Sequence, residues 1–319
     1  MKIFVGLVTY GESSLKYLEK SLAALAGSLN FLNPVDFSVA IFDNSEIGDV
    51  GNKDFITQNY PDFQVISRNG NLGFAKAYNI LIQIARQNQA GYFLMMNPDV
   101  LLEKETISNL MKSLDENGNL ASVCPKLYRW SFPDNSAQKI IDTCGLILLP
   151  GLRFMDLGQG KIDDGRFDDL EILGPSGAAG LFRLSALSRI AVGPAGEEQY
   201  FDERMFMYKE DCDLAYRLFL AGQKSLCVKE AIAWHDRSAA DPGRGLLATL
   251  KDRKSKSENV RRWSFVNQHL IFEKYFRKQS LTSKLRIIKS SVLMFGFALL
   301  KEQFLIKEYK NILAKIRKK

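Results

Sequence analysis

The chain has 319 residues, of which 46% are hydrophobic and 25% charged, and its formal net charge is +7. This composition is ordinary for a globular protein and is enough for one large domain with an appendage, or for two small domains. The four cysteines form no CxxC pair, which argues against a zinc site or a disulfide framework and favours reduced thiols in a cytosolic protein.

The charge is unevenly distributed. Residues 251–319 contain 19 Lys+Arg against 5 Asp+Glu, whereas the first 250 residues contain 24 against 31. A basic tail on an acidic body predicts an anionic surface as the partner of the tail. Anionic lipid is favoured over nucleic acid, because no recognised nucleic-acid-binding module accompanies the charge.

Strands and helices alternate in the first 125 residues. Apolar and β-branched runs predict strands over 2–8, 37–45, 63–68 and 91–99, and helical spacing of apolar residues predicts helices over 13–29, 73–88 and 104–117. This alternation predicts a largely parallel sheet, in which ligands bind at the carboxyl ends of the strands. Four polar side chains should therefore lie along one edge of one crevice: Thr9, Asp43, Arg68 and Asp99.

The alternation stops after about residue 125. Residues 142–169 are rich in Gly and Asp and predict loops with short strands, and 174–184 join a Gly-rich turn to an apolar segment. An amphipathic helix is expected over 206–222, a strand over 225–236, a polar segment over 238–259 and helices from Val260 onward.

Polar residues that could carry chemistry follow these strands. Asp43 and its neighbours could accept hydrogen bonds from a nucleoside, although Asp-Asn-Ser is also a common turn cap. Gly70 and Gly73 free the backbone before a helix, and with Arg68 nearby they could seat an anion or simply form a turn. Asp99 would repel a diphosphate unless a divalent cation lay between them, because hard cations take carboxylate and phosphate oxygens together.

Acidic residues open the helix predicted over 206–222. Glu210 and Asp211 stand where the helix dipole favours carboxylates, and one of them could serve as a general base if it faces the crevice. Asp213 and Arg217 have the spacing of a surface ion pair. His235 follows a strand and could ligate a metal through a neutral imidazole nitrogen, although a lone His is more often structural.

Together and in this order, these motifs resemble those of the inverting GT-A glycosyltransferases of family two, and most closely the bacterial rhamnosyltransferase-like branch. The likeness covers roughly residues 1–275. The residues that carry it are Val8-Thr9-Tyr10, Asp43-Asn44-Ser45, Asn71-Leu72-Gly73-Phe74-Ala75, Asn97-Pro98-Asp99, Ser176-Gly177-Ala178, Phe206-Met207-Tyr208-Lys209-Glu210-Asp211-Cys212-Asp213-Leu214 and His235.

The resemblance implies a role for each motif. Asp211 is the expected general base with Glu210 in support, and Ser176, Gly177 and Ala178 are expected to face the acceptor or sugar. Asp99 and His235 are expected to bind Mg²⁺ or Mn²⁺, although Asn97 replaces the first Asp of the family's DxD motif and leaves fewer protein charges on the metal. The expected nucleotide-sugar contacts are Thr9, Tyr10, Asp43, Asn44, Arg68, Asn71, Gly73, Phe74, Asn97 and Asp99.

The implied activity is single-step inversion at the anomeric carbon. The expected donor is dTDP-L-rhamnose and the acceptor a saccharide or a polyprenyl-diphosphate-linked sugar of bacterial surface polysaccharide. A UDP-hexose or another nucleotide-sugar is the alternative donor. A nucleotidyltransferase is less favoured, since "TYGESS" carries no basic residue before Lys16, and a non-catalytic binding protein is the third hypothesis.

The expected organisation is a GT-A domain over 1–240, with a nucleotide-sugar half (1–125) and an acceptor half (126–240), followed by a basic helical region over 241–319. Ser290–Leu300 is an uncharged run of 11 residues, too short for a span of about 20. The basic helices predict peripheral attachment of a cytoplasmic protein to an anionic membrane surface. Packing on the body, or on another subunit in a homo-oligomer, is the alternative.

Overall fold

The computed structural model describes residues 2–33, 36–68, 70–194, 196–236, 253 and 256–317. The polar segment expected over 238–259 and the domain boundary expected at 240/241 lie largely or wholly outside these ranges.

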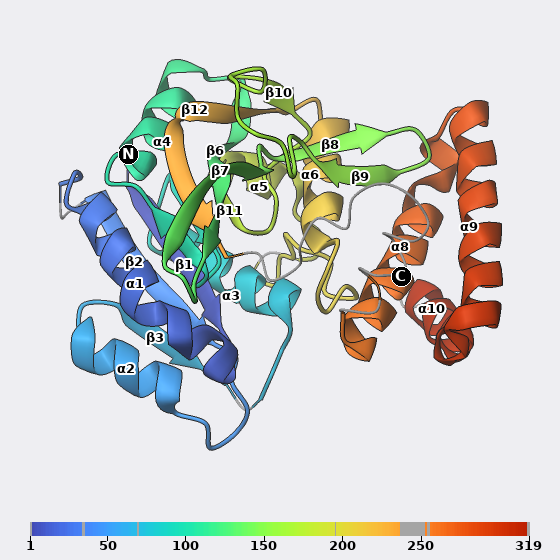
Figure 1. Ribbon diagram of the computed structural model, residues 1–319, viewed down its shortest axis with the longest axis horizontal. Helices are drawn as coiled ribbons and strands as arrows, with labels where there is room; N and C mark the ends of the chain where they lie inside the picture. The colour runs from blue at the N-terminus through green and yellow to red at the C-terminus, as the bar shows by residue number, and fades with distance from the viewer. Residues whose placement is uncertain are drawn as a thin grey trace.

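Strands and helices alternate through the first half of the chain, and helices dominate its end (Figure 1). The strands are β1 (Ile3–Thr9), β2 (Phe37–Asp43), β3 (Gln64–Ser67), β4 (Tyr92–Met96), β5 (Val100–Leu102), β6 (Leu120–Ser131), β7 (Ser136–Thr143), β8 (Leu146–Leu149), β9 (Arg153–Asp156), β10 (Glu171–Ile172), β11 (Ala179–Arg183) and β12 (Lys224–His235). The helices are α1 (Gly11–Leu29), α2 (Gly51–Asn59), α3 (Phe74–Gln87), α4 (Thr106–Glu116), α5 (Leu184–Ile190), α6 (Glu210–Leu220), α8 (Glu258–Tyr275), α9 (Leu281–Lys301) and α10 (Glu308–Arg317), with 3₁₀ turns η2 (Phe276–Lys278) and η3 (Gln303–Lys307).

The main sheet has the order β10-β12-β6-β11-β4-β1-β2-β3. The β3–β2–β1–β4 half is parallel throughout, as the sequence predicts. The sheet then becomes mixed, because β11 runs antiparallel to both β4 and β6 and β12 returns parallel to β6. The parallel half therefore gathers the carboxyl ends of four strands at one edge.

Both faces of the sheet are covered by helices. Residues of β1 alternate between the two cores, with Ile3, Val5 and Leu7 packing with α1 and α4 and Phe4 packing with α3. This alternation follows from the two-residue period of a strand. The side chains of α6 that face the sheet, such as Leu214 and Leu218, belong to the α3 side.

The C-terminal helices share a hydrophobic core with the back of α6. Cys212 and Tyr216 of α6 cluster with Phe265, Ile271 and other residues of α8 to α10. Asp213 is fully buried there, and its carboxylate accepts hydrogen bonds from Arg217 (2.9 Å), Lys274 (2.7 Å) and Tyr275 (2.6 Å). The expectation of a surface Asp213–Arg217 pair is therefore wrong, because α8 covers the pair.

None of the described helices is long and apolar enough to cross a membrane. The four cysteines are buried and free.

Candidate functional site

The strand ends place the predicted polar residues along one edge of the sheet. Thr9 pairs with Asp43 in the β1–β2 register, and Asp43 pairs with Ser67, the residue before Arg68. Asn97 directly follows β4, which lies on the other side of β1. The geometry thus brings together the residues expected to face the nucleotide, with Tyr10 and Arg68 exposed at its margin.

Asp43 is buried and is held by the residues around it. Its Oδ1 atom accepts hydrogen bonds from Thr9 Oγ1 (3.0 Å), Ser45 Oγ (2.6 Å) and Asn52 Nδ2 (3.3 Å). Because all three donors converge on one oxygen, the orientation of the carboxylate at the end of β2 is fixed.

The Asn44 and Asn71 side chains build the turn before α3. Asn44 Nδ2 donates to Asn71 Oδ1 (2.9 Å), and Asn44 Oδ1 accepts from the backbone N–H of Leu72 (2.7 Å). Asn71 Oδ1 also accepts from Gly73 N–H (2.9 Å). The side-chain amides of Asn44 and Asn71 therefore position the loop. The sequence motif alone does not reveal this role.

Gly73 docks this loop against the segment before α6. It has φ of +79°, and a Cβ atom there would lie 2.5 Å from both the ring and the carbonyl oxygen of Phe206. Phe74 N–H donates to the same carbonyl (2.8 Å). The predicted motifs at Asn71–Ala75 and Phe206–Leu214 thus meet through backbone contact.

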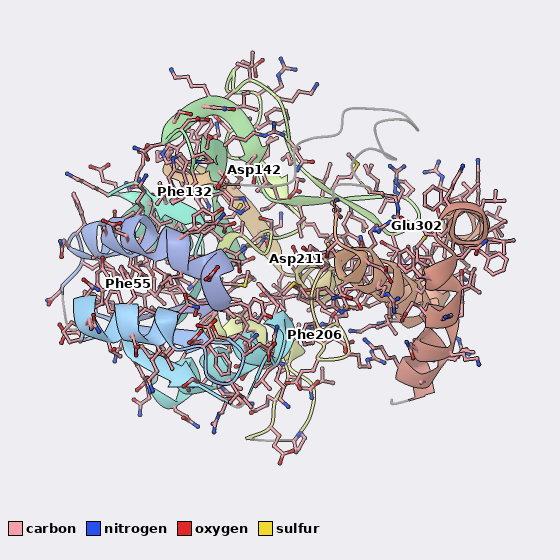
Figure 2. The ribbon with its side chains drawn as sticks, turned by 60° about the horizontal axis from the view of Figure 1, so that its bottom comes forward. Phe55, Phe132, Asp142, Phe206, Asp211 and Glu302 are labelled. Carbon is pink, nitrogen blue, oxygen red and sulfur yellow. The ribbon has the colours of Figure 1, made fainter. Side chains whose placement is uncertain are left out.

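Asp211 lies at the start of α6, half-buried, between the sheet and the C-terminal helices (Figure 2). Its Oδ2 accepts from Gly177 N–H (2.9 Å), and its Oδ1 accepts from Cys212 N–H (2.7 Å). The carbonyl of Ala178 accepts from Asn97 N–H (2.8 Å). The segment Ser176-Gly177-Ala178 therefore links the end of β4 directly to Asp211.

Glu210 occupies a different environment from its neighbour. It is 4% exposed, and its Oε2 is buried without a hydrogen-bond partner among the described residues. Burial, and then the adjacent Asp211 charge, raise the pKa of Glu210 well above its ordinary value. The surroundings therefore favour the protonated, neutral form of this side chain.

Two successive residues before this acidic pair adopt left-handed backbone conformations. Tyr208 has φ of +72° and Lys209 of +68°, conformations that cost about 1–3 kcal/mol each for non-glycine residues. Asn267 of α8, which is 1% exposed, donates to the carbonyls of Met207 (2.9 Å) and Tyr208 (2.7 Å). Nothing in the sequence singled out Asn267 as part of the site.

Asp99 and His235 are brought together by the pairing of β5 with β12, which sets Val100 opposite His235. His235 Nε2 lies 3.4 Å from Asp99 Oδ1, an oxygen that is buried without a hydrogen-bond partner among the described residues. His235 Nδ1 bonds Asp142 Oδ2 at 2.8 Å. Burial alone would lower the pKa of His235, but the carboxylates of Asp99 and Asp142 outweigh it and raise that pKa to about 10.

This arrangement fits a divalent cation. A carboxylate oxygen of Asp99 and Nε2 of His235 face one another at 3.4 Å, and a carboxylate on the far ring nitrogen is the usual support of a metal-binding His. No group of three or more His, Cys, Asp and Glu in the described part of the chain could enclose a metal. The remaining ligands would therefore come from water or substrate. Asp142 was missed from the sequence, because it lies in a segment predicted as loops.

Comparison with known proteins defines the class. A family model, "Glycosyl transferase family 2", matches residues 4–190. The fold is the GT-A fold, with a mixed sheet and C-terminal helices. The chain belongs to glycosyl transferase family 2. No curated protein sequence matches it.

Several solved structures share the fold at low identity. Residues 1–349 of S. aureus TarS in complex with UDP-GlcNAc match with TM-score 0.55 and 17% identity, over 99% of this chain and 81% of that one. GalNAc-T7 with UDP, GalNAc and Mn²⁺ matches with TM-score 0.54 and 10% identity, over 83% of this chain and 50% of that one. The mannosyltransferase PcManGT from Pyrobaculum calidifontis, in complex with GDP-Man and Mn²⁺, matches with TM-score 0.52 and 16% identity. The match covers 98% of this chain and 74% of that one. The chain spans only 37% of the longer TarS chain.

Proposed function

We propose that this protein is an inverting glycosyltransferase that uses a nucleotide-sugar donor and Asp211 as its general base. The observation that carries the proposal is the link between the end of β4 and the start of α6. Gly177 and Ala178 bond Asp211 on one side and Asn97 on the other. These contacts to the backbone fix the base, Asp211, relative to the end of β4, which is expected to face the donor phosphates.

The donor nucleotide lies along the carboxyl edge of the parallel strands. Thr9 and Asp43 form its floor, Tyr10 and Arg68 its exposed margin, and Gly73, Phe74 and Asn97 the wall toward the sugar. Asn44 and Asn71 act by holding the loop, since their amides already bond each other and the backbone.

Asp99 and His235 would hold Mg²⁺ or Mn²⁺ together with oxygens of the donor diphosphate. The ion, when bound, supplies positive charge to the leaving diphosphate. Asp142 orients the imidazole so that Nε2 faces Asp99. Mn²⁺ in GalNAc-T7 and PcManGT, which share the fold, supports this assignment.

Asp211 removes the proton from the acceptor hydroxyl as the sugar is transferred. The N–H groups of Gly177 and Cys212 hold its two oxygens in one orientation, which a general base needs in order to reach its proton. Glu210 is buried next to it in the first turn of α6. One step with one base gives inversion.

We infer that the sugar is a deoxyhexose, L-rhamnose from dTDP-L-rhamnose, and that the acceptor is a saccharide or lipid-linked hydroxyl in bacterial surface polysaccharide. The Gly- and Asp-rich segment 151–169, through its resemblance to the rhamnosyltransferase-like branch, supports this donor. The structural relatives hold UDP-GlcNAc and GDP-Man, so these nucleotide-sugars are the competitors in any test.

Transfer assays with Asp211→Asn test the proposal. We expect kcat to fall about 100- to 10,000-fold, the usual contribution of a general base, while donor affinity stays within a few-fold of wild type. The anomeric configuration of the product, read by NMR, should be inverted. Full activity of Asp211→Asn, or a product with retained configuration, would show the mechanism to be wrong.

A further inference from the structure

The helix α9 presents a long apolar stripe to solvent. Leu281, Leu285, Ile288, Val292, Phe295 and Leu299 recur at intervals of four and three residues, and each is between 45% and 73% exposed. Leu293 and Leu300 widen the stripe. The opposite face of α9, with Ile287 and Ala298, is buried in the C-terminal core. The helix therefore has two apolar faces, and only one is covered by the residues that the structure describes.

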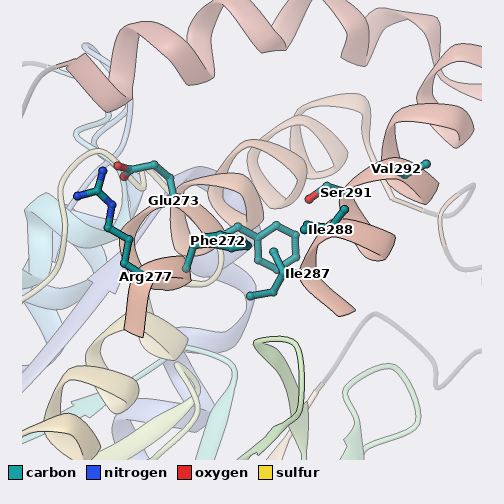
Figure 3. A pocket seen from close by; sticks show the side chains of 8 residues that line it. Phe272, Glu273, Arg277, Ile287, Ile288, Ser291 and Val292 are labelled. Atoms are coloured by element: carbon teal, nitrogen blue, oxygen red, sulfur yellow. The ribbon is translucent and has the colours of Figure 1, made fainter. Parts of the chain in front are cut away.

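A groove extends this surface toward α8. It has a volume of about 480 Å³ and lies between the end of α8, η2 and α9 (Figure 3). Ile288 and Val292 of the stripe form one wall, and Phe272 and Phe276 form the other. Figure 3 shows Arg277 and Glu273 together at one end of the groove. The apolar surface is thus broader than a single helix seam.

Basic residues dominate the exposed charges of the segment that carries the stripe. The exposed charged residues of the described segment 277–316 are all basic: Arg277, Lys278, Arg286, Lys289, Lys301, Lys307 and Lys310. Its two acids, Glu302 and Glu308, are buried and paired with arginines near the start of α8 and just before it. Nothing acidic in the segment offsets the exposed charge.

This charge pattern decides which partner fits the stripe. A second copy of the chain would bring two positive faces together, with Glu273 as the acid that lines the groove, and like charges across an interface are unfavourable. An anionic lipid surface offers both a hydrocarbon boundary for the leucines and negative headgroups for the flanking lysines and arginines.

We propose that the exposed face of α9, with its groove against α8, docks on an anionic phospholipid bilayer. Leu285, Val292 and Leu299 enter the headgroup boundary, and the positive charges of Lys289 and Lys301 attract the anionic headgroups. The inference is independent of the proposed transferase reaction, because it rests on neither the crevice nor its donor.

Vesicle flotation of the full 319-residue chain, without donor or acceptor, tests this. Wild type should float with vesicles of phosphatidylcholine mixed with phosphatidylglycerol, and not with phosphatidylcholine alone. Leu285→Glu/Val292→Glu should weaken binding about tenfold or more, because charges would have to enter the apolar boundary. The control Gln58→Glu/Gln87→Glu lowers the net charge by the same amount at exposed positions on α2 and α3 and should bind like wild type.

A second variant, Lys289→Gln/Lys301→Gln, keeps the stripe and tests the charge separately; it should bind less at low salt. Equal binding to both lipid mixtures, or no loss in either α9 variant, would overturn the proposal. A second outcome would also overturn it: wild type is a dimer by light scattering and does not bind vesicles, and Leu285→Glu/Val292→Glu is a monomer.

Discussion

Glu210 and Asp211 are adjacent in sequence, but their side chains differ in burial and in hydrogen bonding. The backbone N–H groups of Gly177 and Cys212 hold the two oxygens of Asp211, whereas Glu210 is buried with one oxygen that has no partner among the described residues. The sequence predicted both acids as site residues and could not separate their roles. Gly177, just before β11, bonds Asp211, and Asn267 of α8 bonds the turn that precedes both acids. Both contacts come from residues distant in the chain.

Glu210→Gln should keep activity close to wild type and increase stability as the pH rises. The pKa of Glu210 is raised by burial, so above the ordinary Glu pKa of about 4.3 the unfolded state releases a proton that the folded state retains. The free energy of unfolding contributed by Glu210 therefore falls with rising pH, and the neutral amide removes this loss.

Urea unfolding of wild type and Glu210→Gln, at pH values from about 5 to about 8, measures the difference between their free energies of unfolding. This difference should grow with pH. A transfer rate as low as that of Asp211→Asn would instead make Glu210 the base.

At the scale of elements, the approach of the loop before α3 to the segment before α6 assembles the site. Gly73 permits this approach because it has no side chain and a φ of +79°. The motif around Gly73 was visible in the sequence, but its contact with Phe206 was not, since the two are separated by more than a hundred residues.

Gly73→Ala should destabilise the protein by about 2–4 kcal/mol, through backbone strain and overlap with Phe206. Gly27 provides the control, because it lies within α1 and a Cβ atom there would meet nothing within 4 Å. Gly27→Ala should stabilise by up to about 1 kcal/mol. Thermal melting of the two variants compares them, and equal effects would contradict the close packing at Gly73.

Asn267 connects α8 to the strained turn that precedes Asp211. Asn267→Ala would leave two carbonyls without their donor, at a cost of about 1–3 kcal/mol, and should lower kcat with little change in the donor KM. Gln268→Ala is the matched control, since Gln268 lies on the same helix and donates to the carbonyl of Leu152, between β8 and β9 (3.2 Å), rather than to the turn. If both variants lower kcat equally, Asn267 has no specific role in positioning the turn.

For the whole molecule, the sequence predicted the parallel half of the sheet well, and after residue 125 it predicted α6, β12 and the C-terminal helices but not how the strands pair. Continuous apolar runs mark strands buried on both faces, so β1 to β4 and their polar ends were correctly predicted. The short helix α2 was missed, because it buries only Asn52 and Ile56. The antiparallel return of β11 and the pairing of β6 with β12 were missed too, since long-range pairing leaves no local pattern.

The C-terminal helices pack against α6 and support the candidate site. Asp213 of α6 bonds Lys274 and Tyr275 of α8, and Asn267 of α8 holds the turn that leads into Asp211. The basic composition of this region was evident from the sequence. Its support of the site depends on contacts that the sequence does not display.

Calorimetric titration of nucleotide-sugars into wild type and Asp99→Asn, with and without Mn²⁺, tests the central claim most directly. We predict that wild type binds dTDP-L-rhamnose with Mn²⁺ and that Asp99→Asn weakens this binding about tenfold or more, because the carboxylate that meets the cation is lost. A response to a UDP- or GDP-sugar alone would contradict the assigned donor. Failure of every nucleotide-sugar to bind, with or without Mn²⁺, would contradict the proposed function itself.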